Sequence, residues 1–183
     1  MANSPVTGPV RLAWRPTDRR DTTVRMAPET TVAVDLADEA ATERLARGLA
    51  RVARPGDVLA LSGELGSGKT VLARAFIRAL AGSDEEVPSP TFTLAQAYDS
   101  GRGTIWHFDL YRLAAADEAD ELGIDEAMGQ AICLIEWPER LGRLLPAGRL
   151  SITLEAGRHA TARRAVLRCP DAWRARLKEA LGD

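Results

Sequence analysis

The sequence predicts an α/β fold in which a mixed central sheet lies between two layers of helices. In the first half of the chain, short apolar runs alternate with segments whose apolar residues recur at helical spacing. In the second half, strand-like runs cluster together, which favours a mixed sheet over a purely parallel one. A glycine-rich segment at residues 63–70 stands between a predicted strand and a predicted helix, with the spacing G-x-x-x-x-G-K-[ST]. Together these features predict a P-loop NTPase-like three-layer sandwich.

The predicted elements begin after residue 29 and continue to the end of the chain. A strand at residues 31–36 precedes a helix whose apolar stripe ends at Pro55-Gly56. An apolar strand at residues 57–62 leads into the glycine-rich segment, and a helix over residues 71–80 follows it. Further strands are predicted at residues 92–98, 104–110, 131–136, 150–155 and 165–169, and further helices near residues 115–122 and 171–181.

Two regions are predicted within the 183 residues of the chain. Residues 29–183 are long enough for one compact core and form the predicted P-loop ATPase domain. Residues 1–28 are rich in Pro, Thr, Arg and Asp and have little periodicity. We therefore expect them to form a poorly ordered N-terminal extension.

The composition is that of a globular protein without a strong charge bias. Hydrophobic residues make up 45% and charged residues 27%, and the formal net charge of -2 argues against a protein that mainly grips nucleic-acid phosphates. Any contact with RNA is therefore expected to be local or to run through a partner. The sequence shows neither an apolar run of the roughly 20 residues that span a membrane nor the pattern of a signal peptide. Cys133 and Cys169 form no C-x-x-C pair, so we expect a reduced, cytoplasmic location.

The glycine-rich segment predicts a site for a nucleoside triphosphate, most simply ATP with Mg²⁺. Glycines allow backbone N–H groups to approach phosphates, and the start of the following helix adds unpaired donors and a favourable dipole. Lys69 is placed to reach the β- and γ-phosphate oxygens, and Thr70 to offer its hydroxyl to the metal. A chance glycine turn is the alternative, against which the full spacing and the flanking elements argue. The residues of this predicted cofactor site are Gly63, Glu64, Leu65, Gly66, Ser67, Gly68, Lys69 and Thr70.

Two acidic residues close predicted strands downstream of this segment. Asp109 ends the run at residues 104–108, and Glu136 ends the run at residues 131–135. Hydrolysis of a bound triphosphate needs such an acid to hold the magnesium shell or to orient water. Glu136 is the cleaner match, because it closes a continuous hydrophobic strand. Both residues can also be ordinary surface acids, since acids are common at strand ends.

Two features next to these acids have more than one interpretation. His107 lies two residues before Asp109 on the same face of a strand, so it can meet a ligand or merely order the strand end. In the segment at residues 89–93, Thr91 or Thr93 can sense a γ-phosphate, or the segment can be a simple turn into a strand.

Aromatic and basic side chains elsewhere also leave alternatives open. Trp106 and Trp137 flank the two acids and can either pack in the core or press against a nucleotide, core packing being the simpler interpretation. Solvated charge is the default interpretation of Arg158, Arg163 and Arg164, and contact with a triphosphate or a partner is the alternative.

Several short blocks in a fixed order carry a family resemblance across residues 36–138. The blocks are residues 63–70, Ser89-Pro90-Thr91-Phe92-Thr93, His107-Phe108-Asp109-Leu110-Tyr111-Arg112-Leu113, Glu121-Leu122-Gly123-Ile124 and Cys133-Leu134-Ile135-Glu136-Trp137-Pro138. With these blocks the chain resembles the TsaE family, formerly called YjeE, the small bacterial ATPases of tRNA threonylcarbamoyladenosine biosynthesis. Residues 1–28 have no counterpart in the family pattern, and the match fades beyond Pro138.

The resemblance implies a set of site residues and a set of partners. It implies a magnesium-dependent ATPase that works with the TsaB and TsaD proteins, with tRNA contacted only indirectly and no membrane involved. It also implies a switch role for residues 89–93 and places Thr42, on the first helix, beside the adenine. The implied catalytic residues are Lys69, Thr91, Asp109 and Glu136, and the implied metal site comprises Thr70, Asp109 and Glu136.

Two other classes of protein share a phosphate-binding loop of this kind. A small-molecule or nucleoside kinase needs an acceptor pocket and usually an arginine-bearing lid, and no run of arginines that would suit a lid is evident between the predicted helices. A nucleotide-dependent binding module changes shape without meaningful catalysis. A screen for phosphorylated acceptors distinguishes the ATPase from the kinase. Turnover that is slow alone and stimulated by a TsaB and TsaD pair distinguishes it from the binding module.

Overall fold

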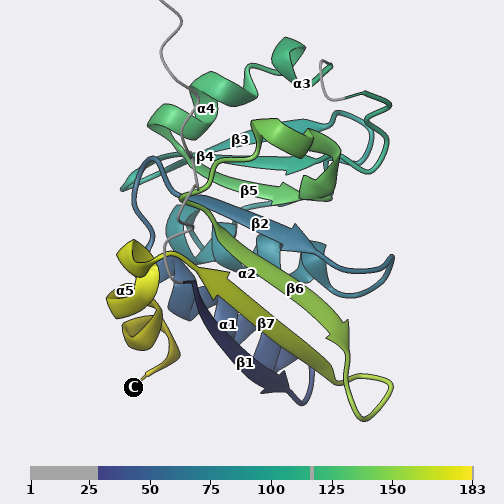
Figure 1. Cartoon of the computed structure of the whole chain (residues 1–183), viewed down its shortest axis with the longest axis vertical. Helices are drawn as coiled ribbons and strands as arrows, with labels where there is room; N and C mark the ends of the chain where they lie inside the picture. Colours follow the sequence, from purple (N-terminus) through teal and green to yellow (C-terminus); the bar gives the residue numbers. More distant parts are fainter. Residues whose placement is uncertain (1–28, 116–117, 183) are drawn as a thin grey trace, which may run out of the picture.

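A computed structural model describes residues 29–115 and 118–182, in which a single sheet carries helices on both faces (Figure 1). The predicted N-terminal extension at residues 1–28 lies outside the described residues. In chain order the elements are β1 (Thr30–Leu36), α1 (Glu39–Val52), β2 (Val58–Ser62), α2 (Lys69–Ala81), β3 (Ala95–Ser100), β4 (Gly103–Asp109), α3 (Glu118–Glu121), α4 (Ile124–Gln130), β5 (Ile132–Glu136), the 3-10 helix η1 (Pro138–Leu144), β6 (Leu150–Ala156), β7 (Arg163–Cys169) and α5 (Asp171–Leu181).

The sheet has seven strands in the order β1-β7-β6-β2-β5-β4-β3. Its centre is parallel, because β2 lies between β5 and β6 and pairs in parallel with both, and β4 pairs in parallel with β5. Its two margins are antiparallel, where β3 pairs with β4, and β7 pairs with both β6 and β1. The sheet is therefore mixed, as the sequence predicts. The carboxyl ends of β2, β4 and β5 lie at one edge of the parallel centre, where ligands of such sheets usually bind.

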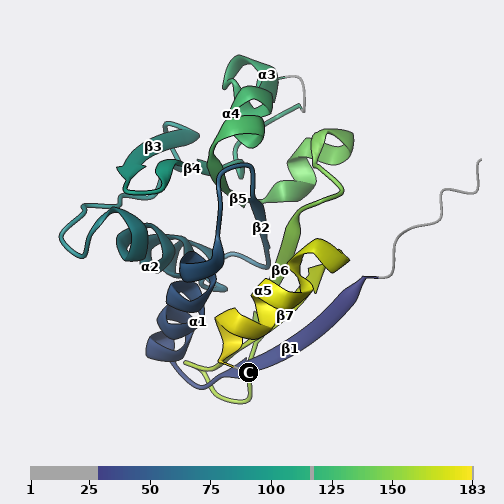
Figure 2. The same cartoon turned by 90° about the vertical axis from the view of Figure 1, so that its left-hand side faces the viewer.

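Side chains that alternate along the central strands belong to two separate hydrophobic cores, one on each face of the sheet. On one face, Leu59, Leu61 and Leu134 pack with α1, α2 and α5. On the other, Cys133 and Ile135 pack with apolar side chains of α3, α4 and η1. Because successive side chains of a strand point to opposite faces of the sheet, one continuous buried run contributes to both cores. The three layers of the predicted sandwich are thus present (Figure 2).

The first helix is fixed at its start by a local cap and along its length by packing. The Asp38 side chain accepts a hydrogen bond from the backbone N–H of Ala41 at 2.7 Å, which satisfies one of the unpaired donors of the first turn. The apolar stripe of α1 is buried against α2 and α5, with Leu49 fully inaccessible. Residues 38–52 therefore form a rigid support beside α2, the helix that follows the glycine-rich segment.

Most of the predicted elements are confirmed, and the differences lie around residues 90–145. The strand predicted at residues 92–98 begins only at Ala95, because the preceding residues form a turn in which the Leu94 N–H donates to the Pro90 carbonyl at 2.6 Å. Leu94 has a φ of 62°, which a regular strand does not allow. The helix predicted near residues 115–122 is reduced to α3, while residues 116 and 117 lie outside the described part.

Two short helices, α4 and η1, were not predicted from the sequence. Each has seven residues, and in each a few apolar side chains, such as Ile124 and Leu141, pack on the sheet. A stretch of seven residues is too short for helical periodicity to stand out.

None of the helices in the described part of the chain combines the length and the apolar character needed to cross a membrane.

Gly48 marks the closest approach between α1 and α5, and its substitution tests this packing. A Cβ atom at Gly48 would overlap the backbone carbonyl of Ala180. We expect Gly48→Ala to lower the free energy of unfolding by about 1–3 kcal/mol, as overpacking does, although alanine favours helix by about 1 kcal/mol over glycine. Denaturation in urea measures the change.

Gly129 on α4 supplies the matched control for this prediction. A Cβ atom at Gly129 meets nothing within 4 Å, so Gly129→Ala should stabilise the fold by roughly 0.5–1 kcal/mol through helix propensity alone. If Gly48→Ala is as stable as Gly129→Ala, α5 does not pack on α1 in this way.

Candidate functional site

The glycine-rich segment turns sharply between the end of β2 and the start of α2. Gly63 and Gly68 have φ values of 138° and 103°, in the region that residues with a side chain rarely adopt. A Cβ atom at Gly63 would lie 2.5 Å from the Leu154 carbonyl oxygen of β6. Glycine is therefore required at position 63, both because of its backbone conformation and because a Cβ atom would not fit. The turn that glycine permits brings backbone N–H groups to one side of the segment.

The helix that follows begins at Lys69 without a side-chain cap. Gly68 precedes it and has no side chain to offer, while the Leu72 N–H closes the first turn on the Gly68 carbonyl at 3.0 Å. The first N–H groups of any α-helix have no intrahelical partner, and the helix dipole adds positive potential at the same end. The start of α2 is therefore suited to bind an anion.

The Lys69 ammonium lies within the mouth of the turn rather than in solvent. Its Nζ donates to the Gly63 carbonyl at 2.7 Å and to the Glu64 carbonyl at 2.9 Å. It also lies 3.9 Å from the centroid of the Trp137 ring. Burial lowers the pKa of Lys69 from its ordinary value, and the carboxylates of Glu136, Glu139 and Asp109 act in the opposite direction.

The position of Trp137 depends on an unusual backbone conformation at the end of β5. Trp137 has a φ of 58°, which is uncommon for a residue with a large side chain, and Pro138 follows it. Its N–H donates to the Leu61 carbonyl of β2 at 3.2 Å, and its ring packs against Tyr111 with 4.9 Å between centroids. Trp137 therefore lines the site, and it also packs against the core on the side of α3, α4 and η1, so the sequence-based preference for core packing holds for part of this side chain.

Trp106 differs from Trp137 in its position. Its ring stacks on Phe108 at 5.6 Å between centroids and packs against the core formed with α3 and α4. The core interpretation is correct for Trp106.

Glu136 connects α2 to the central strands through two contacts. Its Oε2 accepts a hydrogen bond from the Thr70 hydroxyl at 2.9 Å, and its Oε1 lies 2.9 Å from Nε2 of His107. His107 is fully buried and Glu136 is 2% exposed. His107 thus orders the end of the strands through Glu136 and not through Asp109, its neighbour two residues along β4.

Asp109 is held by the segment that precedes β3. Its Oδ2 accepts hydrogen bonds from the Thr91 hydroxyl at 2.7 Å and from the Ser89 hydroxyl at 3.5 Å. Its Oδ1 accepts from the backbone N–H of Tyr111 at 3.2 Å. The segment at residues 89–93 is therefore in direct contact with a strand-end carboxylate, which is more than a simple turn provides.

Strand register places the two candidate acids side by side. Asp109 and Glu136 are direct partners in the parallel pair of β4 and β5. Their side chains consequently project from the same face, toward the start of α2. A cavity of about 250 Å³ lies here, and its lining includes Lys69, Thr70, Thr91, Asp109, Glu136 and Trp137.

The remaining predicted residues lie around this cavity in two further places. Leu65, Gly66 and Gly68 also line it, whereas Gly63, Glu64 and Ser67 line the opposite side of the turn, beside β6. Thr42 lines a neighbouring pocket together with Gly68 and Val71, and its hydroxyl donates to the Asp38 carbonyl at 3.4 Å. The predicted adenine side is therefore a separate pocket, which shares Gly68 and Val71 with the cavity and is also lined by Arg163.

The donor set near Thr70 suits magnesium better than a metal held only by protein. In the described part of the chain, no group of three or more His, Cys, Asp or Glu side chains can hold a metal ion. A hydroxyl and a carboxylate oxygen do meet at Thr70 and Glu136, and Mg²⁺ is usually bound by one or two carboxylates together with phosphates and waters. The side chains of Thr70 and Glu136, with Asp109 next to them, fit such a site.

Arg163 is a residue for which the sequence left contact with a triphosphate or a partner only as the alternative interpretation. Its guanidinium donates to the backbone carbonyls of Gly66 and Ser67 in the glycine-rich segment. The default interpretation of Arg163 as solvated charge is therefore wrong. The residue alternates with core positions on an ordinary strand, and nothing in that pattern indicates a partner almost a hundred residues away.

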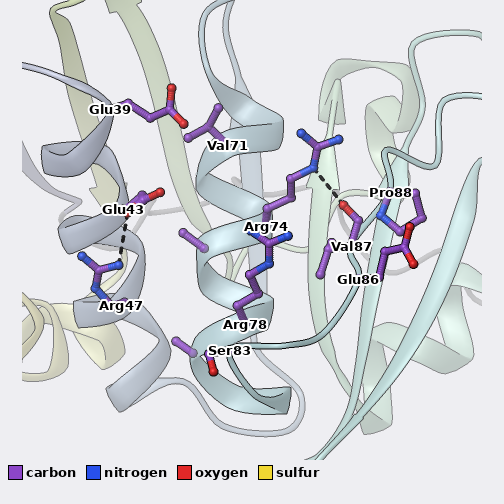
Figure 3. A pocket seen from close by; sticks show the side chains of 12 residues that line it. Glu39, Glu43, Arg47, Val71, Arg74, Arg78, Ser83, Glu86, Val87 and Pro88 are labelled. Atoms are coloured by element: carbon purple, nitrogen blue, oxygen red, sulfur yellow. Dashed lines mark hydrogen bonds and ion pairs between the residues drawn. The ribbon is translucent and has the colours of Figure 1, made fainter.

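A larger groove, of about 690 Å³, lies between α1, α2 and residues 83–88 (Figure 3). Figure 3 shows Arg74 of α2 reaching the backbone of Val87, to whose carbonyl its Nε donates at 2.8 Å. Arg78, one turn later, donates from Nε to the Glu85 carbonyl at 3.1 Å. The predicted acids and Lys69 do not line this groove. Its arginines instead tie α2 to the segment that leads into Ser89.

Comparison with known proteins decides the family. The family model described as threonylcarbamoyl adenosine biosynthesis protein TsaE matches residues 36–166, which include every residue of the cavity described above. The chain belongs to the TsaE family. This family takes part in tRNA threonylcarbamoyladenosine biosynthesis, so the resemblance identified from the sequence is confirmed.

Individual TsaE proteins match over much of their length. The chain is 41% identical to TsaE from Rickettsia conorii over 66% of this chain and 69% of the relative. It is 42% identical to TsaE from Bacillus subtilis over 62% of this chain and 71% of the relative. The crystal structure of Bacillus subtilis YdiB is similar with a TM-score of 0.67 and 29% identity, covering 85% of this chain and 96% of that one. These similarities confirm the P-loop NTPase-like fold.

The buried contact between His107 and Glu136 leads to a prediction about stability. His107→Leu removes the donor and leaves a buried carboxylate oxygen without it, whereas the side-chain amide of His107→Gln can still donate. We expect the free energy of unfolding to fall by about 1–3 kcal/mol more in the leucine variant than in the glutamine variant. Equal losses in urea denaturation would show that the contact does not hold Glu136.

Proposed function

We propose that this TsaE-family chain is a Mg²⁺-dependent ATPase that supports tRNA threonylcarbamoyladenosine modification by acting with the TsaB and TsaD proteins. Contact with tRNA is indirect in this proposal, and the location is the cytoplasm. The observation that carries the proposal is one cavity that gathers Lys69, Thr70, Asp109 and Glu136 at the start of α2. This combination of a phosphate-binding turn with strand-end acids is what phosphoryl transfer to water requires.

Binding of the triphosphate is assigned to the turn and to Lys69. The N–H groups at the start of α2 supply donors that folding has already oriented, so little reorganisation is needed when phosphate oxygens arrive. Lys69 is held by two carbonyls and an indole face, which are weaker partners for an ammonium than phosphate oxygens. We expect Lys69 to exchange these contacts for the β- and γ-phosphate oxygens.

The metal site is assigned to Thr70 and Glu136, with Asp109 beside them. When bound, Mg²⁺ neutralises charge on the β- and γ-phosphate oxygens. Glu136 offers a carboxylate that His107 already orients from the opposite side. Thr70 offers a hydroxyl that points at that carboxylate.

Hydrolysis is assigned to Asp109 under the control of Thr91. A γ-phosphate offers the Thr91 hydroxyl an alternative acceptor, which frees Asp109 Oδ2 to accept a hydrogen bond from the attacking water. In this step the water oxygen bonds to the γ-phosphorus, the bond from that phosphorus to the bridging oxygen breaks, and ADP leaves with that oxygen. The proton of the water passes to a carboxylate or phosphate oxygen.

The distribution of exposed apolar side chains supports a protein partner rather than a small acceptor. Among the described residues, the large hydrophobic side chains that are exposed are Leu65 at 79%, Phe92 at 83% and Tyr111 at 43%. Leu65 and Tyr111 line the cavity, and Phe92 follows Thr91, which also lines it. An exposed apolar group around one site is typical of a protein interface. It favours the partner-dependent ATPase over a kinase.

Loss of the Lys69 ammonium should affect mainly ATP binding, whereas loss of the Glu136 carboxylate should affect mainly hydrolysis. We expect Lys69→Ala to weaken ATP binding by roughly a hundredfold or more, because it removes the charged donor from the phosphate site. We expect Glu136→Gln to lose most hydrolysis while it retains much of the binding, because the amide keeps the shape but not the charge. Calorimetry with ATP and Mg²⁺ and a phosphate-release assay measure the two effects.

Glu126→Gln is the matched control for Glu136→Gln, because it makes the same chemical change on the exposed face of α4. It should bind and hydrolyse ATP like the wild type. Wild-type turnover in Lys69→Ala or Glu136→Gln would refute the proposed site.

Phe92→Ser tests the partner interface separately from the nucleotide site. The ring is exposed and contacts the Arg112 guanidinium at 4.6 Å, so its loss should leave ATP affinity within about twofold of the wild type. Stimulation of hydrolysis by a purified TsaB and TsaD pair should fall about tenfold or more, as expected for an aromatic anchor. Gln130→Ser, at an exposed site on α4, is the control. Full stimulation of Phe92→Ser would exclude Phe92 from the interface.

A further inference from the structure

Arg163 connects the start of β7 to the glycine-rich segment through its guanidinium. Its Nε donates to the Ser67 carbonyl at 3.0 Å, and one terminal nitrogen donates to the Gly66 carbonyl at 3.2 Å. The other terminal nitrogen donates to the carbonyls of Ala160 and Ala162 at 2.9 Å and 2.8 Å. The side chain thereby joins the loop between β6 and β7 to the turn between β2 and α2.

These four contacts occupy most of the hydrogen-bonding capacity of the side chain. A guanidinium has five N–H groups in a fixed plane, so one remains. Two of the five N–H groups hold the carbonyls of Gly66 and Ser67, and a ligand could take either of these two only if the turn gave up a contact that holds it. The geometry thus favours a role for Arg163 in holding the turn over direct contact with a ligand.

The contact with Ser67 fixes the direction of the following N–H group. A peptide unit is planar and trans, so the C=O of Ser67 and the N–H of Gly68 point in opposite directions. Arg163 holds the Ser67 carbonyl on the side of β7. The Gly68 N–H then points away from the Arg163 guanidinium, and Gly68 lines the cavity with Lys69 and Thr70.

The neighbouring peptide unit is fixed from within the turn as well. The Gly66 carbonyl is held by Arg163, while the N–H of Ser67 in the same unit donates to the Glu64 carbonyl at 3.1 Å. The Gly68 N–H has no comparable contact among the backbone hydrogen bonds of the described turns. Glycine at position 68 also has φ of 103° and no side chain that could restrict rotation. The direction of this one N–H therefore depends on the restraint of the Ser67 carbonyl.

We propose that Arg163 is a positioning residue that orients the Gly68 N–H into the phosphate cavity by holding the carbonyls of Gly66 and Ser67. The identity of the ligand as a triphosphate rests on the proposed function, whereas the orientation of the peptide unit does not. Because Arg163 already restrains this peptide unit before the ligand binds, less conformational entropy is lost on binding. In this role Arg163 contributes to affinity through the turn and not through a contact of its own with the phosphates.

The test compares Arg163→Gln and Arg163→Lys with Arg164→Ala, the matched control. Arg164 is the next residue on β7, is exposed, and alternates to the opposite side of the strand. Lysine keeps the positive charge but has no planar fork that can hold two carbonyls at once. If charge near the phosphates were the role of Arg163, lysine would restore it.

Two measurements, made at a temperature where every variant is folded, give the answer. Calorimetry with ATP and Mg²⁺ should show affinity reduced about tenfold in both Arg163 variants and unchanged in Arg164→Ala, since lost hydrogen bonds to a charged group have about this effect. The amide resonance of Gly68 in two-dimensional NMR of the chain without nucleotide should shift in both Arg163 variants only.

The outcomes separate this inference from the proposed function. Wild-type ATP affinity in Arg163→Lys, or an unchanged Gly68 resonance in both Arg163 variants, would overturn the positioning role. If the wild-type chain itself gave no heat with ATP and Mg²⁺, the proposed function would fail, and the Gly68 resonance would still decide whether Arg163 orients the peptide unit.

Discussion

The Glu136 carboxylate accepts a hydrogen bond from Thr70 on one oxygen and lies against His107 on the other, deep in the fold. Burying a carboxylate is costly unless hydrogen bonds replace the water that it loses. The two contacts offset this cost and, in doing so, fix three elements relative to one another, namely the start of α2, the end of β5 and the strand β4. The acidic edge of the sheet and the phosphate-binding turn therefore form one unit and not two parts that meet by chance.

Other contacts extend from this unit to both sides of the turn. Asp109 lies in register with Glu136 and holds Thr91, so the segment at residues 89–93 is coupled to the same edge of the sheet. On the far side, Arg163 holds the outer carbonyls of the turn. The glycine-rich segment, which has little side-chain structure of its own, is thus positioned by residues from β4, β5 and β7. This arrangement fits a family that takes part in tRNA threonylcarbamoyladenosine biosynthesis, and it is the basis for the proposed ATPase activity.

The sequence predicts those parts of the site that depend on local pattern. Spacing and flanking elements predict the turn at residues 63–70, and the ends of hydrophobic runs predict Asp109 and Glu136. It does not predict contacts that depend on strand order, because β7 comes close to the turn only after β6 has paired with β2. The contact of Arg163 with the turn is missed for this reason, and so is the pairing of His107 with Glu136. The late start of β3 is missed because the left-handed conformation of Leu94 runs against the β-like sequence around it.

Crystallography of the chain with a non-hydrolysable ATP analogue and Mn²⁺ can locate both the nucleotide and the metal, because manganese is identified by its anomalous scattering. We expect the triphosphate along residues 63–70 and the manganese peak beside the Thr70 hydroxyl and the Glu136 carboxylate, with Lys69 moved from the Gly63 and Glu64 carbonyls to the phosphates. A nucleotide bound in the groove between α1 and α2, or a manganese ion distant from both Thr70 and Glu136, would contradict the proposed site.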